Sequence, residues 1–116
     1  MCRKMKGLLD MKPFIFALTL AFIGGLATAY AAERSITQKG KVFSESEVTI
    51  KKGDVIVFVN DDNVHHNVLS TSHGNIFNSG AVGPGGSTPI TFNAAGEVAV
   101  ICAIHPSMKL KVTITN

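Results

Sequence analysis

From residue 33 onward the chain consists of short runs of strand-forming residues separated by turn-forming residues, with no apolar stripe at helical spacing. Residues 55–59 (Val-Ile-Val-Phe-Val) are β-branched or aromatic throughout, which is typical of a strand buried on both faces. Residues 110–115 alternate apolar and polar side chains, which predicts a strand with one face on a core. Such a chain can bury its apolar faces by packing sheet against sheet or by closing one sheet into a barrel.

Other runs of strand character lie at residues 47–50, 66–70, 89–92 and 97–102, with Gly, Pro, Asn and Asp between them. About seven or eight short strands without helices predict an all-β fold, in which two antiparallel sheets form a β-sandwich. A small closed barrel has a similar sequence signature and stays open as the alternative. The 116 residues suffice for one such domain.

The N-terminal segment has the pattern of a secretory signal peptide. Residues 14–23 are continuously apolar, four basic residues precede them, and alanines at positions 27, 29 and 31 follow. The apolar run is shorter than the roughly 20 residues of a membrane-spanning helix. We therefore expect residues 1–31 to be a cleaved signal peptide and residues 32–116 to form a periplasmic or otherwise exported domain without stable membrane insertion.

The expected cleavage makes the protein nearly neutral. It removes four of 11 basic residues and one of eight acidic residues, so that seven of each sign are left. The exported domain has neither a basic stripe nor basic residues interleaved with aromatic ones, so binding to nucleic acid is not expected. A net charge near zero also gives no long-range steering toward a particular partner.

The expected exported domain contains a single cysteine, Cys102, because Cys2 lies in the leader. An internal disulfide is therefore impossible, although exported proteins commonly use cysteine in this way. Cys102 begins the sequence Cys-Ala-Ile-His-Pro-Ser-Met, which places a thiolate, the imidazole of His105 and the thioether of Met108 at three-residue intervals between two predicted strands. Such a loop can arrange three donor atoms around one point.

An imidazole from a distant strand, that of His66, would complete a rigid site. Two imidazoles, one thiolate and a weak axial thioether are typical of blue-copper electron-transfer centres. Zinc prefers four strong donors, and iron–sulfur clusters need several thiolates. We therefore predict one type I copper per chain, held by His66, Cys102, His105 and Met108. An inert buried thiol and a core methionine are the ordinary alternatives for two of these residues.

Three segments resemble the cupredoxins, the small type I copper proteins that include plastocyanin, pseudoazurin and amicyanin. They are residues 60–68, which end in His-Asn-Val; residues 76–80 with the Gly-Pro-Gly at 83–85; and the Cys-x-x-His-x-x-Met loop, which has the short amicyanin spacing. The resemblance covers residues 41–116. It implies a Greek-key β-sandwich that shuttles single electrons between Cu(I) and Cu(II) and meets its redox partner proteins transiently.

The chain departs from the common family pattern at three positions without losing a donor. His65 stands where many members have Pro, Val100 where Tyr or Phe is common, and Leu110 where Gly often follows Met-Lys.

We make a separate prediction for each of the polar residues His65, His73 and Asn67. Side chains of adjacent strand residues point to opposite faces, so only one of His65 and His66 can reach an interior metal. The resemblance selects His66 and leaves His65 exposed or at the rim of the site. We expect His73 on the solvated surface. Asn67 is expected to tie the His66 strand to the Cys102 loop through hydrogen bonds.

These observations predict a monomeric electron carrier that is not an enzyme. We expect the ring edge of His105 to be exposed within an apolar patch and to serve as the electron's exit. The alternative function is periplasmic copper binding or delivery without a redox role. A multicopper oxidase or a copper nitrite reductase would need further histidines and domains, and Ile101 and Ala103 flank Cys102 where a relay to a trinuclear copper site would have histidine.

Overall fold

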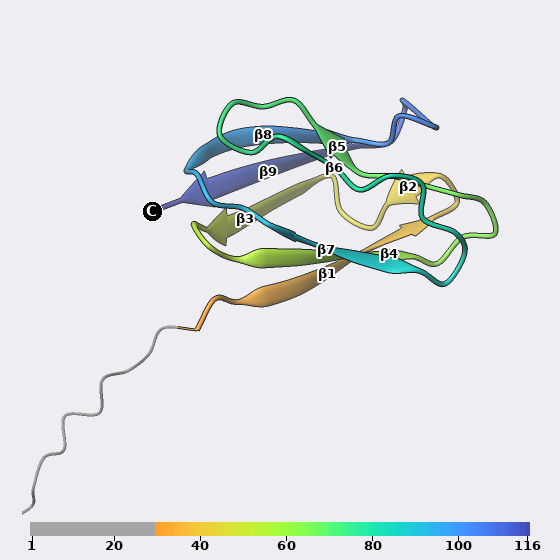
Figure 1. The fold of residues 1–116 in the computed structure, drawn as a ribbon, viewed down its shortest axis with the longest axis horizontal. Helices are drawn as coiled ribbons and strands as arrows, with labels where there is room; N and C mark the ends of the chain where they lie inside the picture. The colour runs from red at the N-terminus through yellow and green to blue at the C-terminus, as the bar shows by residue number, and fades with distance from the viewer. Residues whose placement is uncertain (1–29) are drawn as a thin grey trace, which may run out of the picture.

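The computed structural model describes residues 30–116, and this part of the chain contains nine strands and no helix. The strands lie in two sheets that face each other, as Figure 1 shows. The described residues contain no helix capable of crossing a membrane. Most of the expected signal peptide, residues 1–29, lies outside the described residues. The strands are β1 (Glu33–Lys39), β2 (Val42–Phe43), β3 (Glu47–Lys51), β4 (Val55–Asn60), β5 (Leu69–Ser70), β6 (Phe77–Asn78), β7 (Ser87–Thr91), β8 (Gly96–Ile101) and β9 (Lys109–Thr115).

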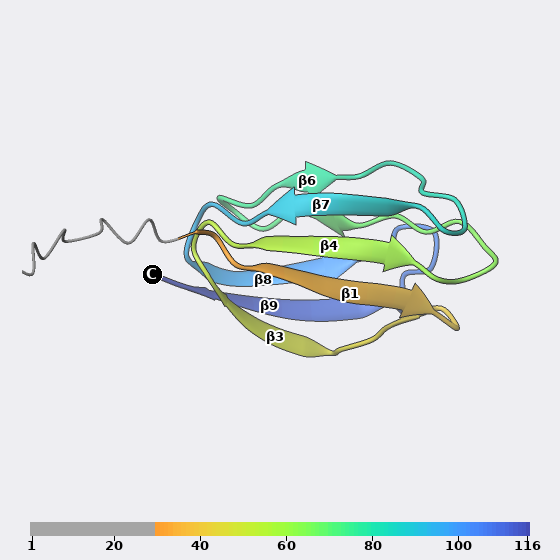
Figure 2. The ribbon, with the colours of Figure 1, turned by 90° about the horizontal axis from the view of Figure 1, so that it is seen from below.

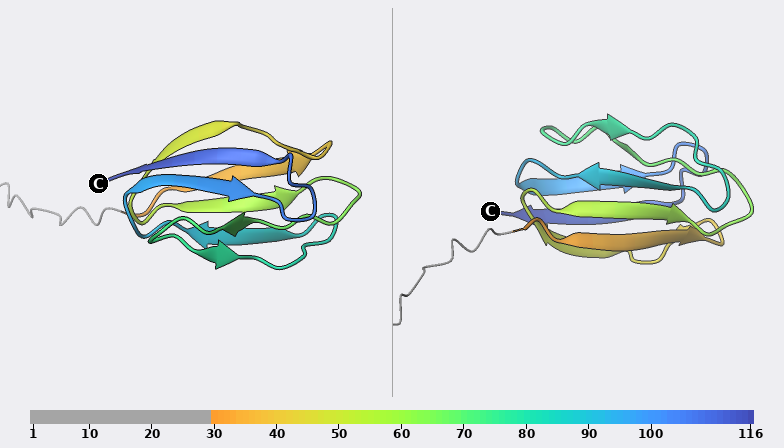
Figure 3. Two further views of the ribbon diagram at one scale, coloured as in Figure 1. Left: turned by 90° about the horizontal axis from the view of Figure 1, so that it is seen from above. Right: turned by 60° about the horizontal axis from the view of Figure 1, so that its bottom comes forward.

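One sheet has the strand order β2-β1-β4-β7 and the other the order β3-β9-β8-β5-β6. Figure 2 shows β1, β4 and β7 in front of β8 and β9, and both views of Figure 3 show the same two layers. The predicted all-β sandwich is therefore confirmed, and the alternative of a closed barrel is not formed. The sheets are mixed rather than antiparallel, because β1 pairs with β4 and β3 pairs with β9 in parallel.

The core lies between the two sheets and is made by alternate residues of each strand. In β9 the predicted alternation is confirmed, since Leu110, Val112 and Ile114 are buried. In β4 the expectation of burial on both faces is wrong. Ile56 and Phe58 are buried, whereas the three valines of β4 are only half-buried. The valines lie on the outer face of the sheet, which no second layer from residues 30–116 covers, and neighbouring strands shield them in part.

One predicted strand differs from the expectation in a way that bears on the site. The run predicted at residues 66–70 forms a strand only at its end, β5, and His66 instead makes an isolated bridge with Val82. The run predicted at residues 89–92 overlaps β7, which begins two residues earlier and ends at Thr91. Pro89 is tolerated there because β7 is an edge strand, in which a residue without an N–H need not remove a hydrogen bond to a neighbouring strand.

Candidate metal centre

The first ligand segment follows β4, and Asn60 at the end of that strand fixes its path. The Asn60 side-chain amide donates to the carbonyls of Val64 (2.9 Å) and Val82 (2.8 Å). Its Oδ1 atom accepts the backbone N–H of Asp62 at 3.0 Å. Asn60 is fully buried, so these bonds satisfy polar groups that water cannot reach. One side chain thereby sets the position of the whole turn that leads to His66.

The segment before β7 supports the same turn from the other side. His66 and Val82 exchange backbone hydrogen bonds of 3.1 and 2.7 Å. The Gly85 N–H donates to the carbonyl of Asn60, and the Asn60 N–H donates to the carbonyl of Gly86, both at 2.8 Å. Gly85 adopts a φ of 80°, a left-handed conformation that glycine reaches without strain. His66 is therefore held by a rigid framework although it does not belong to a strand.

The second ligand segment is the short loop between β8 and β9. The Cys102 N–H donates to the carbonyl of Met108 (3.3 Å), and the Met108 N–H donates to the carbonyl of His105 (2.9 Å). These two bonds connect the end of the loop to its beginning and to its middle, so that Cys102, His105 and Met108 lie in one closed turn. In Figure 1 this loop lies at the end of the sandwich away from the C terminus.

Asn67 joins the two ligand segments, as expected. Its Oδ1 atom accepts the backbone N–H of Ala103 at 2.6 Å, and its own N–H points to the Cys102 sulfur at 3.5 Å. Gln38 adds a contact that the sequence did not suggest, because its side-chain amide donates to the Asn67 carbonyl at 3.3 Å. The sequence feature that could have revealed this contact is the position of Gln38, two residues after Ile36 and therefore on the same inward face of β1.

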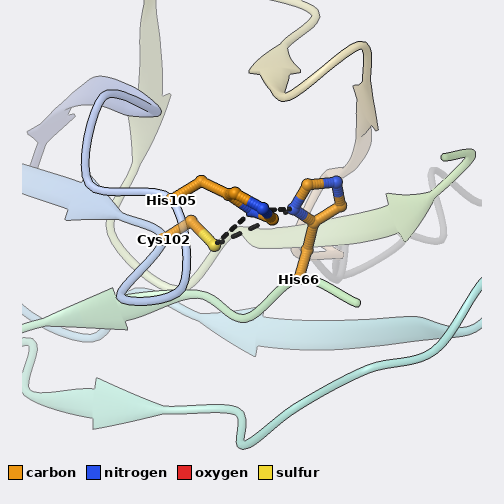
Figure 4. A group of neighbouring side chains, drawn as sticks. All are labelled: His66, Cys102 and His105. Atoms are coloured by element: carbon orange, nitrogen blue, oxygen red, sulfur yellow. Dashed lines mark hydrogen bonds between the residues drawn. The ribbon is translucent and has the colours of Figure 1, made fainter. Parts of the chain in front are cut away.

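Three predicted ligands come together within a few ångströms (Figure 4). The Nδ1 atoms of His66 and His105 are 3.1 Å apart, and the Cys102 sulfur lies 3.8 and 3.9 Å from them. Cys102 and His66 are fully buried, whereas His105 is half-buried. Two nitrogens and one sulfur therefore converge from segments more than thirty residues apart.

The donor triangle has the size and chemistry of a soft-metal site. Metal–ligand bonds are about 2.0 Å to imidazole nitrogen and about 2.3 Å to thiolate sulfur, with zinc as the reference. The sides of the triangle are 3.1, 3.8 and 3.9 Å, so His66, Cys102 and His105 could hold one ion at those distances. A nearly planar N₂S set with a weak axial donor is typical of type I copper.

The other predicted residues lie as follows. The Met108 side chain is buried, with 1% of its surface exposed. His65 is exposed and faces Gly83, which confirms that it points away from the interior. His73 is exposed, as predicted.

Asp62 is a polar partner of the site that sequence reasoning missed. The His66 Nε2–H group donates to Asp62 Oδ2 at 2.9 Å. This hydrogen bond, followed by one from the Lys41 backbone N–H, lowers the pKa of Asp62 from 3.8 to about 2. Asp62 lies four residues before His66 in a segment without strand character, and that spacing was the only signal in the sequence.

Comparisons with solved structures agree with the fold. A purple cupredoxin from Nitrosopumilus maritimus is 23% identical with a TM-score of 0.64, over 71% of this chain and 99% of that one. An amicyanin variant in the Cu(I) state is 21% identical with a TM-score of 0.65, over 72% and 81%. A copper-containing nitrite reductase from Thermus scotoductus SA-01 is 24% identical with a TM-score of 0.66, over 75% of this chain but only 23% of the enzyme. A comparison with curated proteins found no match.

The fold and the three converging donors define a β-sandwich protein with a soft-donor metal centre. The sequence profile of the copper binding proteins of the plastocyanin/azurin family matches residues 31–115. The chain therefore belongs to this family and is a cupredoxin. Its cofactor is copper in a type I site, at which His66, Cys102 and His105 are grouped.

Proposed function

We propose that the protein is an exported electron carrier that alternates between Cu(I) and Cu(II), with His66, Cys102 and His105 as equatorial ligands and Met108 as the axial ligand. The observation that supports this most directly is the convergence of two imidazole nitrogens and one thiolate from two separate segments. A carrier must change oxidation state without moving its ligands, and the hydrogen bonds around Asn60 and Asn67 hold the two segments rigidly.

The difference in exposure among the ligands supports electron transfer rather than substrate turnover. His66 and Cys102 are fully buried, so a substrate molecule has no access to the copper from their side. His105 is half-buried, and its neighbour Ile104 is 46% exposed. An electron can leave through the His105 ring, and the apolar surface around it suits brief docking of a partner protein, as small transient interfaces do.

Copper delivery, the alternative function, requires a site that exchanges its metal readily. The buried thiolate and the hydrogen bond from Ala103 to Asn67 favour slow exchange instead. The two functions differ in a measurable rate. Slow copper loss to a strong chelator would support the carrier, and rapid loss would support delivery.

Export as residues 32–116 is supported by two hydrogen bonds that Ala32 makes with Asp54 and Val55 at the start of β4. The Ala32 N–H donates to Asp54 Oδ1 at 3.0 Å, and the Ala32 carbonyl accepts the N–H of Val55 at 2.9 Å. Cleavage after Ala31 would turn the Ala32 nitrogen into an ammonium group beside the Asp54 carboxylate, which strengthens this contact. N-terminal sequencing of the exported protein is expected to begin at Ala32. A start well inside β1 would contradict the proposed boundary.

The decisive experiment is Cu(II) addition to purified residues 32–116 with visible and electron paramagnetic resonance spectra. We expect an intense blue thiolate-to-copper band, followed by reversible one-electron reduction. Cys102→Ser is expected to abolish the band while the fold is kept, and His66→Ala is expected to weaken copper binding strongly.

His73→Ala is the matched control, because His73 is exposed and lies outside the donor cluster. It is expected to leave the spectrum unchanged. A colourless complex of the wild-type protein, or a blue band that survives Cys102→Ser, would show that the proposed function is wrong.

A further inference from the structure

The buried imidazole of His66 has a carboxylate on the side opposite to the donor cluster. Its Nδ1 atom points to His105 and Cys102, and its Nε2 atom lies 2.9 Å from Asp62 Oδ2. An ionised carboxylate can only accept hydrogen bonds, so the proton of the neutral ring resides on Nε2. This arrangement leaves the Nδ1 lone pair directed at the cluster.

Asp62 is itself fixed by two backbone donors. The Lys41 N–H donates to Oδ2 and the Asn63 N–H donates to Oδ1, both at 3.0 Å. The Asp62 side chain is only 12% exposed, so water replaces few of these contacts. The carboxylate therefore has a single orientation, in which Oδ2 faces the His66 ring.

Lys41 reaches Asp62 from a distant turn. It lies between β1 and β2, and its φ of 57° is the only positive value at a non-glycine residue in the described part of the chain. Figure 1 shows this turn at the same end of the sandwich as the loop between β8 and β9. A left-handed lysine is strained, and the bond from its N–H to the carboxylate helps to offset that strain.

We propose that Asp62 is a positioning residue that holds His66 in the Nε2–H tautomer and stabilises Cu(II) over Cu(I), and thereby lowers the reduction potential. The inference rests on the proposed copper site. A carboxylate hydrogen-bonded to the far nitrogen of a ligating imidazole makes that ligand more basic. A negative charge at this short range in a mostly buried site also favours the more positive metal ion.

The test compares Asp62→Asn with Asp61→Asn. Both variants remove one negative charge from adjacent positions, but the Asp61 side chain is 64% exposed and its nearest ion-pair contact is Lys39 at 3.9 Å. Asp62→Asn keeps the size of the side chain and an oxygen that can accept the Nε2–H bond. We expect Asp62→Asn to weaken Cu(II) binding relative to Cu(I) about tenfold, which is a rise of about 59 mV in the potential for one electron.

Asp61→Asn is expected to leave the potential close to that of the wild type. Equal potentials for the two aspartate variants would overturn the proposal, because the effect would then depend on net charge and not on the contact with His66. In that case the wild-type protein would still be blue. Absence of a blue band from the wild type would instead contradict the proposed function, so the two failures are distinguishable.

A second measurement does not depend on any variant folding or on copper. Nitrogen-15 NMR of the metal-free wild-type protein at mildly alkaline pH reports which ring nitrogen of His66 is protonated. We expect protonated Nε2 and slow exchange of its proton. A proton on Nδ1 would overturn the proposal whatever the variants show.

Discussion

The side-chain oxygen of Asn67 accepts the backbone N–H of Ala103 at 2.6 Å and thereby joins the segment that contains His66 to the loop that begins at Cys102. The two segments lie 36 residues apart in the chain. Asn67 thus stabilises the distance between two candidate ligands, in addition to the pairing of Leu69 in β5 with Ile101 in β8.

Asn67→Ala is expected to lower the free energy of unfolding by about 1–2 kcal/mol, because the Ala103 N–H loses its acceptor. Copper loss to a chelator is expected to speed up at the same time. Asn78→Ala is the control, since the Asn78 side-chain oxygen likewise accepts a backbone N–H, that of Gly80, at an exposed position. Equal rates of copper loss in the two variants would contradict this role of Asn67.

Gly86→Ala is expected to destabilise the framework behind His66. A Cβ atom at Gly86 would lie 2.7 Å from Val82 Cγ1 and 3.1 Å from the carbonyl oxygen of Gly83. Such overpacking typically lowers the free energy of unfolding by about 1–3 kcal/mol. Gly83→Ala is the matched control, because its Cβ would meet only the exposed His65 ring, at 3.4 Å. Urea unfolding is expected to show a lower midpoint for Gly86→Ala alone.

The ligand loop could be predicted from the sequence because its three donors lie within seven consecutive residues. Its spacing is local, so tertiary structure was not needed to recognise it. Local geometry indicated only that His65 and His66 point in opposite directions, and the family resemblance then selected His66. The structure agrees, with His66 buried and His65 exposed.

The rest of the fold depends on contacts between distant segments. Strand β1 has only one large apolar residue, Ile36, and it is defined mainly by its parallel pairing with β4. Asp62 likewise has no recognisable motif, because its role depends on the Lys41 N–H from a separate turn. The pattern of residues in a single sequence indicates the local preference for strand or turn. It does not indicate which distant strand will pair in parallel or which distant turn will donate a hydrogen bond.

The stability of the metal-free protein is expected to depend on the Asp62 carboxylate in acid. The pKa of Asp62 is lowered from 3.8 to about 2, chiefly by its hydrogen bond with His66. A lowered pKa means that this carboxylate stabilises the fold above about pH 4 and loses its effect as the pH falls toward 2. Asp62→Asn does not titrate in this range. The difference in unfolding free energy between wild type and Asp62→Asn should therefore shrink from pH 5 to pH 2, as urea unfolding can measure. A constant difference would contradict the assignment.

Met108→Leu tests the axial position separately from the equatorial donors. The Met108 backbone is fixed at both ends, by its N–H to the His105 carbonyl and by its carbonyl to the Cys102 N–H, so that a leucine of similar volume is expected to keep the loop. The blue band comes from the Cys102 sulfur and should persist. Loss of a weak thioether donor disfavours Cu(II) more than Cu(I), because axial ligands tune the potential of such sites. We expect the potential to rise by at least about 59 mV, a tenfold change in relative affinity. Cyclic voltammetry measures this shift, and an unchanged potential would show that the Met108 sulfur only packs the core.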